Sequence, residues 1–219
     1  MLLLDRKNFG EQAINKIATL ALSSQLNEAQ QLNVRVKTDP TLLSQGKLAS
    51  LLIDGTGLVT RGDLRMQQMY LEMDEIAVSP FKALMGNIVL TQPTQGTAKF
   101  VLTEKDFDRA LNRLQLRDRV SCQLSKNGEL AILESQDRVI LTAIPTIQGK
   151  GEKVTLEMRS LNASFPAKQV KILVGELENI LNLRNFGMTG IALIIQKLEL
   201  GNGYLTLNAT ATMTQFPAK

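Results

Sequence analysis

The sequence predicts an α+β fold in which a bent, mostly antiparallel sheet wraps around a few amphipathic helices. Three observations support this class. Groups of short alternating strands are separated by tight turns and only a few helical segments, which is typical of antiparallel α+β proteins. Two of the longer strands change the phase of their apolar residues part of the way along. No linker rich in proline, glycine or serine divides residues 1–219, so we expect one domain.

Three segments have helical spacing of their apolar residues. The first covers 9–24, where Asn8 and Glu11 resemble a capping box. The second begins after Thr103, with Asp106 in the position of a capping partner. The third follows Pro166 and has one apolar stripe at i, i+3, i+4, i+7 and i+11, with Gly187 as the expected C-terminal cap. A shorter helical turn, 81–85, should start at Pro80 and stop at Gly86.

The remaining periodic segments alternate as strands. Strand 48–53 is expected to end in a turn at Gly55-Thr56-Gly57, and Gly201-Asn202-Gly203 should close a C-terminal hairpin of 188–200 and 204–215. The other predicted strands are 33–37, 98–102, 120–125, 130–134, 138–144 and 154–163.

The segment 64–78 is the most informative. Leu64 and Met66 share one phase, Met69, Leu71 and Met73 the opposite one, and Ile76 returns to the first. A one-residue slip turns every later side chain to the other face, so a strand that keeps one face buried must bulge or break at each slip. Residues 191–200 repeat the pattern, with a slip at Gln196-Lys197. Long bent strands around an apolar interior, or short strands separated by turns, both fit.

Composition excludes several function classes. The chain has no histidine, which removes Ser-His and Cys-His catalysis and histidine-ligated zinc. The net charge is only +4, no segment concentrates it, and aromatic residues are 4%, which disfavours a nucleic-acid binder. The single cysteine, Cys122, is interpreted as a buried small apolar residue rather than a reactive thiol. We expect neither a cofactor nor a metal.

Short motifs give weak signals. Ser44-Gln45-Gly46-Lys47 fits the S-x-x-K pattern of serine hydrolases, but its companion motifs are missing. Gly55-Thr56-Gly57 starts like a dinucleotide fingerprint, but Thr60 replaces the third glycine and no helix follows. We therefore expect no enzyme.

Two groups of residues are candidates for a binding site. Apolar side chains between 64 and 85 could line a site for an irregular apolar ligand, because methionine is flexible and polarizable, although most methionines fill a core. These candidates are Leu64, Met66, Met69, Leu71, Met73, Phe81, Leu84 and Met85. Basic residues could contact an anionic headgroup, or could form a solvated face partly neutralised by Asp106 and Asp108. These candidates are Arg61, Arg65, Lys105, Arg109 and Arg113.

No segment has the run of apolar residues that a membrane span or a signal-peptide core requires. The expected location is therefore cytoplasmic or peripheral to a membrane, or the cell envelope if the natural chain is longer.

A series of short motifs between residues 46 and 112 resembles the LmeA-like family of bacterial phospholipid-binding proteins, and Gly10–Ala13 agrees with it. The motifs are Ile53–Val59, Asp63–Gln67, Ile76–Pro80, Ala83–Asn87, Leu90–Pro93, Val101–Glu104 and Asp106–Asn112. The resemblance implies a tubular lipid-binding fold, in which a bent sheet wraps a long helix around an apolar groove, and an anionic phospholipid as the ligand.

From the residue patterns and the family resemblance together, we expect non-catalytic binding of a phospholipid or another amphipathic lipid in an apolar groove. This binding would serve lipid transport, extraction or membrane-surface association. Peripheral contact with a membrane is compatible with this function, and nucleic acid is not expected as a partner. The alternative is a protein-interaction or assembly module without a lipid ligand.

Overall fold

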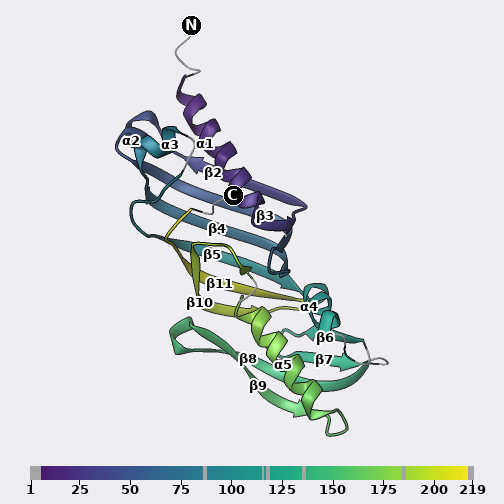
Figure 1. Ribbon diagram of the computed structural model, residues 1–219. Coiled ribbons are helices and arrows are strands. Elements are labelled where there is room, and N and C mark those ends of the chain that lie inside the picture. The colour runs from purple at the N-terminus through teal and green to yellow at the C-terminus, as the bar shows by residue number, and fades with distance from the viewer. Residues whose placement is uncertain are drawn as a thin grey trace.

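The computed structural model describes residues 6–85, 88–114, 116, 119–134, 137–183 and 186–216, except for the side chains of 6–11, 13, 83 and 84. The fold is α+β and antiparallel, as the sequence predicts, and its strands form two sheets instead of one (Figure 1). The larger sheet has seven strands in the order β1-β3-β4-β5-β11-β10, with β2 also paired to β3. Its strands are β1 (Leu26–Glu28), β2 (Gln31–Lys37), β3 (Lys47–Thr60), β4 (Arg65–Ala77), β5 (Thr94–Thr103), β10 (Ile191–Leu200) and β11 (Tyr204–Met213).

The smaller sheet has four strands in the order β6-β7-β8-β9 and carries helix α5 (Ala167–Leu181). The apolar stripe of α5 is buried as predicted, apart from Val174, which is half-buried. The strands are β6 (Val120–Leu124), β7 (Leu130–Glu134), β8 (Arg138–Gln148) and β9 (Lys153–Leu161). The remaining elements are α1 (Arg6–Ser23), α2 (Pro40–Ser44), α3 (Pro80–Leu84), α4 (Glu104–Leu111) and the 3₁₀ turns η1 (Asn112–Leu114) and η3 (Gly149–Gly151).

Helix α1 lies across one end of the larger sheet, against β2 (Figure 1). Its buried residues include Ile14, Ala18 and Leu22, while β2 buries Val34 and Val36. The Asn15 side chain accepts a hydrogen bond from the backbone N–H of Val36. An edge strand has N–H groups with no strand partner, so this bond helps to protect the edge. We call the side of the sheet that carries Val34 and Val36 the inner face.

The predicted phase slips in β4 are present, and β4 is one continuous strand across both of them. Met66, Met69, Met73 and Ile76 are all buried, although they do not share one alternation. The pairing of β3 with β4 keeps the same register along its whole length, so neither strand has an extra residue. A residue with left-handed backbone lies at each slip instead: Glu75 in β4, with φ of 52°, and Gly57 in β3, with φ of 57°.

The phase slip in β10 is absorbed by a β-bulge. The register changes between Ile195 and Lys197, which leaves Gln196 as an extra residue, and apolar side chains on both sides of it face inward. The prediction of bent strands is therefore confirmed in both strands. The slips in β4 coincide with left-handed residues, and the slip in β10 coincides with an extra residue.

Three local predictions were wrong. Gly55-Thr56-Gly57 does not end a strand, because β3 continues to Thr60 and Thr56 is paired with Gln68. Gly187 does not cap α5, which ends at Leu181 with Asn182 as its C-cap, although Gly187 does have a left-handed backbone. Helix α1 already includes Arg6, so Asn8 lies inside the helix and not at its cap. The predicted stop at Gly86 lies outside the described residues.

Helix α4 joins the two sheets through a repeated polar contact. Side chains at every fourth helical position accept hydrogen bonds from every second N–H of β6: Glu104 from Leu124 (2.8 Å), Asp108 from Cys122 (2.6 Å) and Asn112 from Val120 (3.1 Å). Four helical residues advance about 6 Å and two strand residues about 6.6 Å, so the two repeats match. The helix thereby provides hydrogen-bond acceptors for the N–H groups of β6, the edge strand of the smaller sheet.

Asp108 is the central member of this contact, and burial raises the pKa of its carboxyl group above the usual value. A carboxyl whose pKa is raised by folding favours the folded state while it is protonated and loses that benefit as the pH rises through the folded pKa. Asparagine keeps the acceptor oxygen without the charge. We therefore expect Asp108→Asn to gain stability relative to the natural chain between about pH 3 and pH 7. Urea unfolding at several pH values measures this, and a difference that shrinks with rising pH would contradict it.

In the ranges given above, no helix combines the length and the apolar character needed to cross a bilayer.

Candidate functional site

The inner face of the larger sheet is apolar across six strands. Paired residues form three rows, which are built mainly of aliphatic, methionine and small side chains. The rows are Val34-Ile53-Leu71-Ala98-Ala209-Ile195, Val36-Leu51-Met73-Gly96-Ala211-Leu193 and Leu32-Gly55-Met69-Phe100-Leu207-Leu198.

The middle of this face is made of small residues. Strands β5 and β11 contribute Gly96, Ala98, Ala209 and Ala211, which face inward on neighbouring rows. A Cβ at Gly96 would collide with the Glu72 carbonyl oxygen, so that position accepts only glycine without a backbone shift. The result is a shallow strip, flanked by larger side chains, down the centre of the inner face.

Five of the predicted apolar candidates belong to this interior. Leu64, Met66, Met69, Leu71 and Met73 are all buried, the last four with no measurable exposure. The inner face is covered in part by Phe186, whose ring stands edge-on to that of Phe100 with 5.2 Å between the ring centroids. A ligand can therefore reach these side chains only if a covering segment moves.

The other three apolar candidates lie elsewhere. Phe81 and Met85 belong to the α3 turn at the edge of the fold, and both are 72% exposed. The side chain of Leu84 lies outside the described residues. The structure thus does not bring α3 together with the interior that Met66 to Met73 occupy.

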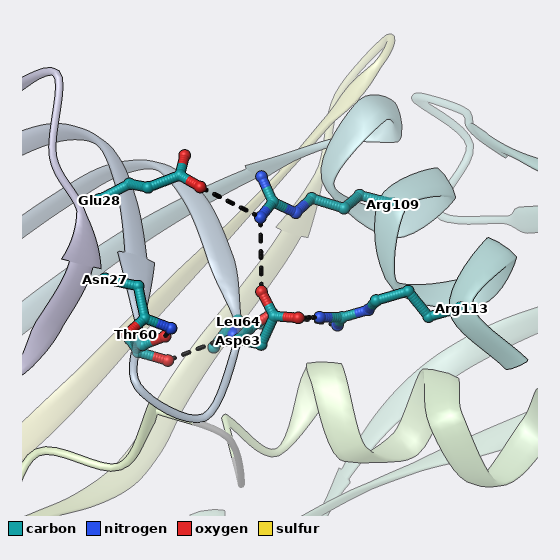
Figure 2. A network of polar contacts seen from close by, with 7 residues as sticks. All are labelled: Asn27, Glu28, Thr60, Asp63, Leu64, Arg109 and Arg113. Atoms are coloured by element: carbon teal, nitrogen blue, oxygen red, sulfur yellow. Dashed lines mark hydrogen bonds and ion pairs between the residues drawn. The ribbon is translucent and has the colours of Figure 1, made fainter.

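The basic candidates gather where the β3–β4 turn meets α4, and Figure 2 shows the centre of this cluster. Asp63, in the turn, lies between Arg109 and Arg113 and pairs with both, at 3.4 Å from Arg109 Nη2. Arg109 also reaches Glu28 at 3.5 Å, and Arg113 donates to the Asp63 carbonyl oxygen at 3.0 Å. The two arginines therefore tie the turn to α4, and Arg109 also ties α4 to β1.

Arg65 and Asp106 form the most buried ion pair of this region. The Asp106 side chain is 1% exposed and that of Arg65 21% exposed. The same carboxylate accepts hydrogen bonds from Thr103 N (2.7 Å) and Thr103 Oγ1 (2.9 Å), which confirms the predicted capping signature of α4. Arg65 is thus held by a fixed carboxylate inside the fold.

Arg61 and Lys105 complete the predicted basic set. Both are exposed, and the ion pairs found within the described ranges do not use either of them. We call Arg61, Arg65, Lys105, Arg109 and Arg113 the basic cluster. It adjoins the end of β4 where Leu64 and Met66 enter the interior.

The Ser44-Gln45-Gly46-Lys47 motif spans the end of α2 and the start of β3. Ser44 Oγ donates to the Thr41 carbonyl oxygen at 2.7 Å, and Gly46, with φ of 72°, separates α2 from β3, which Lys47 begins. Cys122 is buried, as predicted, and burial raises the pKa of its thiol well above the usual value, so the reactive thiolate is disfavoured. Over the part of the chain that the structure describes, no three His, Cys, Asp or Glu side chains gather as metal ligands do.

The outer face of the larger sheet has a shallow hollow of about 270 Å³. Its lining is mixed, with Tyr70, Lys99, Gln196 and Asn208 among its polar members. Tyr70 donates to Glu72 at 3.0 Å, and this bond is the main cause that raises the pKa of the Tyr70 phenol.

Sequence reasoning missed the acidic partners of the basic cluster. Asp63 and Glu28 lie far from α4 in sequence, and nothing local marks them as partners of Arg109. The small residues of the central strip were visible as alternating alanines in β11, but their alignment with Gly96 and Ala98 depends on strand pairing.

A family model described as LmeA-like phospholipid-binding matches residues 6–210. No curated protein and no solved structure matches the chain.

Proposed function

The chain belongs to the LmeA-like phospholipid-binding family, and we propose that it binds one phospholipid, preferably an anionic one, with the acyl chains along the inner face of the larger sheet. The observation that carries the proposal is the set of three apolar rows with a central strip of small residues. Acyl chains are long and thin, so a strip of small side chains between larger ones offers them contact along their length. Burial of each CH₂ contributes about 0.8 kcal/mol.

The proposed site is closed in this structure, so binding includes an opening step. Helix α1 is the best candidate for the part that moves, because it contributes small residues, Ala18 and Ala21, to its buried side and packs mainly on the edge strand β2. Separating it from the sheet exposes the Val34 and Val36 ends of two rows while the pairing among β3, β4, β5 and β11 stays intact.

The basic cluster supports the anionic preference. It has five cationic groups and three paired carboxylates, Glu28, Asp63 and Asp106, and it borders the interior at Leu64. In the proposal, Arg61 and Lys105 attract the headgroup directly, while Arg109 and Arg113 exchange Asp63 for the phosphate. A carrier with this arrangement can extract a phospholipid from a membrane and move it, without a catalytic step.

We expect the double variant Arg61→Glu/Lys105→Glu to lose about tenfold or more in affinity for phosphatidylglycerol, because each cation near an anionic surface contributes about 1 kcal/mol. Affinity for phosphatidylcholine should change little. Titration with short-chain lipids below their critical micelle concentration, followed by native mass spectrometry, measures both.

The control is Lys126→Glu/Lys168→Glu, which changes the net charge by the same amount at exposed positions of the smaller sheet and α5. If the control loses as much affinity as the test variant, only net charge matters and the headgroup assignment fails. If the natural chain binds neither lipid, the proposed function itself fails.

The alternative, an assembly module without a lipid, rests on β9. This edge strand exposes Met158 and Leu161, and two copies could pair there. Light scattering across a wide concentration range decides this point: a stable dimer that takes up no lipid would favour assembly.

A further inference from the structure

The α3 turn presents the two most exposed large apolar side chains among the residues described. Phe81 and Met85 are each 72% exposed, and the bond from Met85 N to the Phe81 carbonyl oxygen, 3.2 Å, places them one helical turn apart on the same side. Single exposed apolar side chains are common, but two adjacent ones at the tip of a projecting turn form a contact surface.

The turn is held firmly at its base. Val78 N donates to the Gly46 carbonyl oxygen at 2.8 Å, Ser79 N to Val89 O at 2.9 Å, and Thr91 N to Ala77 O at 3.0 Å. The turn between these anchors is therefore presented in a fixed position, near the end of α2 at one end of the larger sheet (Figure 1).

Three lysines lie around the turn. Lys82 lies between Phe81 and Met85 in sequence, and Lys37 and Lys47 lie at the ends of β2 and β3 on the same side. All three are exposed, and they are absent from the ion pairs found among the described residues. Lys37 and Lys47 are linked through Thr38, whose hydroxyl donates to the Lys47 carbonyl oxygen at 3.2 Å.

Carboxylates also lie at this end of the sheet, among them Asp39, Asp74 and the exposed Glu75, two residues along β4 from Ala77, which pairs with Lys47. Asp39 accepts hydrogen bonds from Thr41 N and Leu42 N at the start of α2, at 2.8 and 2.9 Å. Asp74 pairs in register with Ser50, three residues along β3 from Lys47, which is about 10 Å. The turn itself, residues 80–88, thus combines an apolar pair with one lysine, Lys82, and has no acidic residue.

We propose that Phe81, Met85 and Lys82, supported by Lys37 and Lys47, dock the protein on the surface of an anionic lipid bilayer. Apolar side chains that enter the acyl boundary, ringed by lysines that meet anionic headgroups, are the combination that an interfacial contact requires. The inference rests on the proposed function, because a protein that takes up phospholipid must meet a membrane. It assigns the meeting point to α3, at the opposite end of β3 and β4 from the basic cluster.

A fluorescence experiment tests this contact directly. The chain contains no tryptophan, so Phe81→Trp introduces a single indole at the tip. Adding phosphatidylcholine vesicles that contain phosphatidylglycerol should shift its emission to shorter wavelength. Leu161→Trp, an exposed apolar position on β9, is the matched control and should not shift. A shift of equal size at both positions, or at neither, would overturn the proposal.

Flotation of the same vesicles supplies the second test. Phe81→Ser/Met85→Ser should bind vesicles at least about tenfold more weakly than the natural chain, because two apolar contacts are lost. Met158→Ser/Leu161→Ser should bind as the natural chain does. Equal vesicle binding by both double variants would contradict the proposal.

Binding of soluble short-chain phospholipid separates this inference from the proposed function. The α3 double variant should keep that binding, since its substitutions lie outside the inner face. Loss of vesicle binding alone supports the docking tip. A natural chain that docks on vesicles through Phe81 but binds no soluble lipid would contradict the proposed function and leave the tip intact. If the α3 double variant loses both vesicle binding and binding of soluble lipid, the proposal that α3 only docks the protein on membranes is overturned.

Discussion

Replacing Asp106 with alanine is expected to lower the free energy of unfolding by about 3–5 kcal/mol. The Asp106 side chain is 1% exposed, pairs with Arg65 and accepts two hydrogen bonds from Thr103. Its removal leaves a partly buried arginine without a counter-ion and also removes the cap of α4. Since α4 joins the two sheets through β6, the loss affects both of them. Urea or thermal unfolding, followed by circular dichroism, measures the change.

Asp63→Ala is the matched control for this variant. Asp63 also pairs with arginines, but its side chain is 43% exposed, so its ion pairs are largely screened. We expect a loss of about 1 kcal/mol or less. If the two alanine variants are equally stable, burial does not strengthen the Arg65–Asp106 pair as we infer. A double-mutant cycle with Arg65→Ala then measures the coupling between the two residues directly.

Filling the central strip should have the largest effect on lipid binding. Ala98→Leu/Ala209→Leu places two larger side chains on paired positions of β5 and β11, where we propose that an acyl chain lies. Displacing about four CH₂ groups at about 0.8 kcal/mol each predicts a roughly hundredfold weaker affinity for phospholipid. Uptake of short-chain phosphatidylglycerol, measured by native mass spectrometry, gives this ratio.

The control for the filled strip uses the neighbouring residues of the same strands. Thr97→Leu/Thr210→Leu changes a paired position on the outer face, which the proposal leaves without a lipid contact. Overpacking alone costs about 1–3 kcal/mol of stability, so unfolding curves of both variants must be recorded and uptake compared where both are folded. Equal affinities for the two double variants would show that the inner face does not hold the lipid.

The bend of the sheet could be predicted because the alternation of apolar residues changes phase along two of its strands. Met66, Met69 and Met73 cannot share one face of a regular strand, and all three are buried. The backbone conformation that absorbs each phase slip could not be predicted in the same way. In β10 an extra residue absorbs the slip, whereas in β4 a left-handed Glu75 does so without changing the register. Both solutions bury the same side chains, so the burial pattern alone does not distinguish them.

Local turn signals were less reliable than periodicity. Gly55 and Gly57 look like a turn, but both are buried within β3, and Gly57 supplies the left-handed backbone at a slip. A glycine that lets the chain reverse and a glycine that lets a strand twist have the same sequence signature. The choice between them depends on β4, which lies alongside only after folding.

The candidate site was predicted in composition and only partly in position. The interior residues of β4 were identified by their alternation, but Phe81 and Met85 continue that apolar list in sequence and lie outside the core in space. The basic stripe of α4 was also visible in the sequence. Its carboxylate partners were not, because Asp63 comes from a distant turn.

The central claim is that this chain holds a phospholipid between the inner face and its cover. Native and denaturing mass spectrometry of freshly purified protein, with organic extraction of whatever it carries, tests the claim most directly. We predict a native mass that exceeds the chain mass by about one phospholipid, with an anionic headgroup in the extract. A native mass equal to the chain alone, together with no uptake of lipid from anionic vesicles, would contradict it.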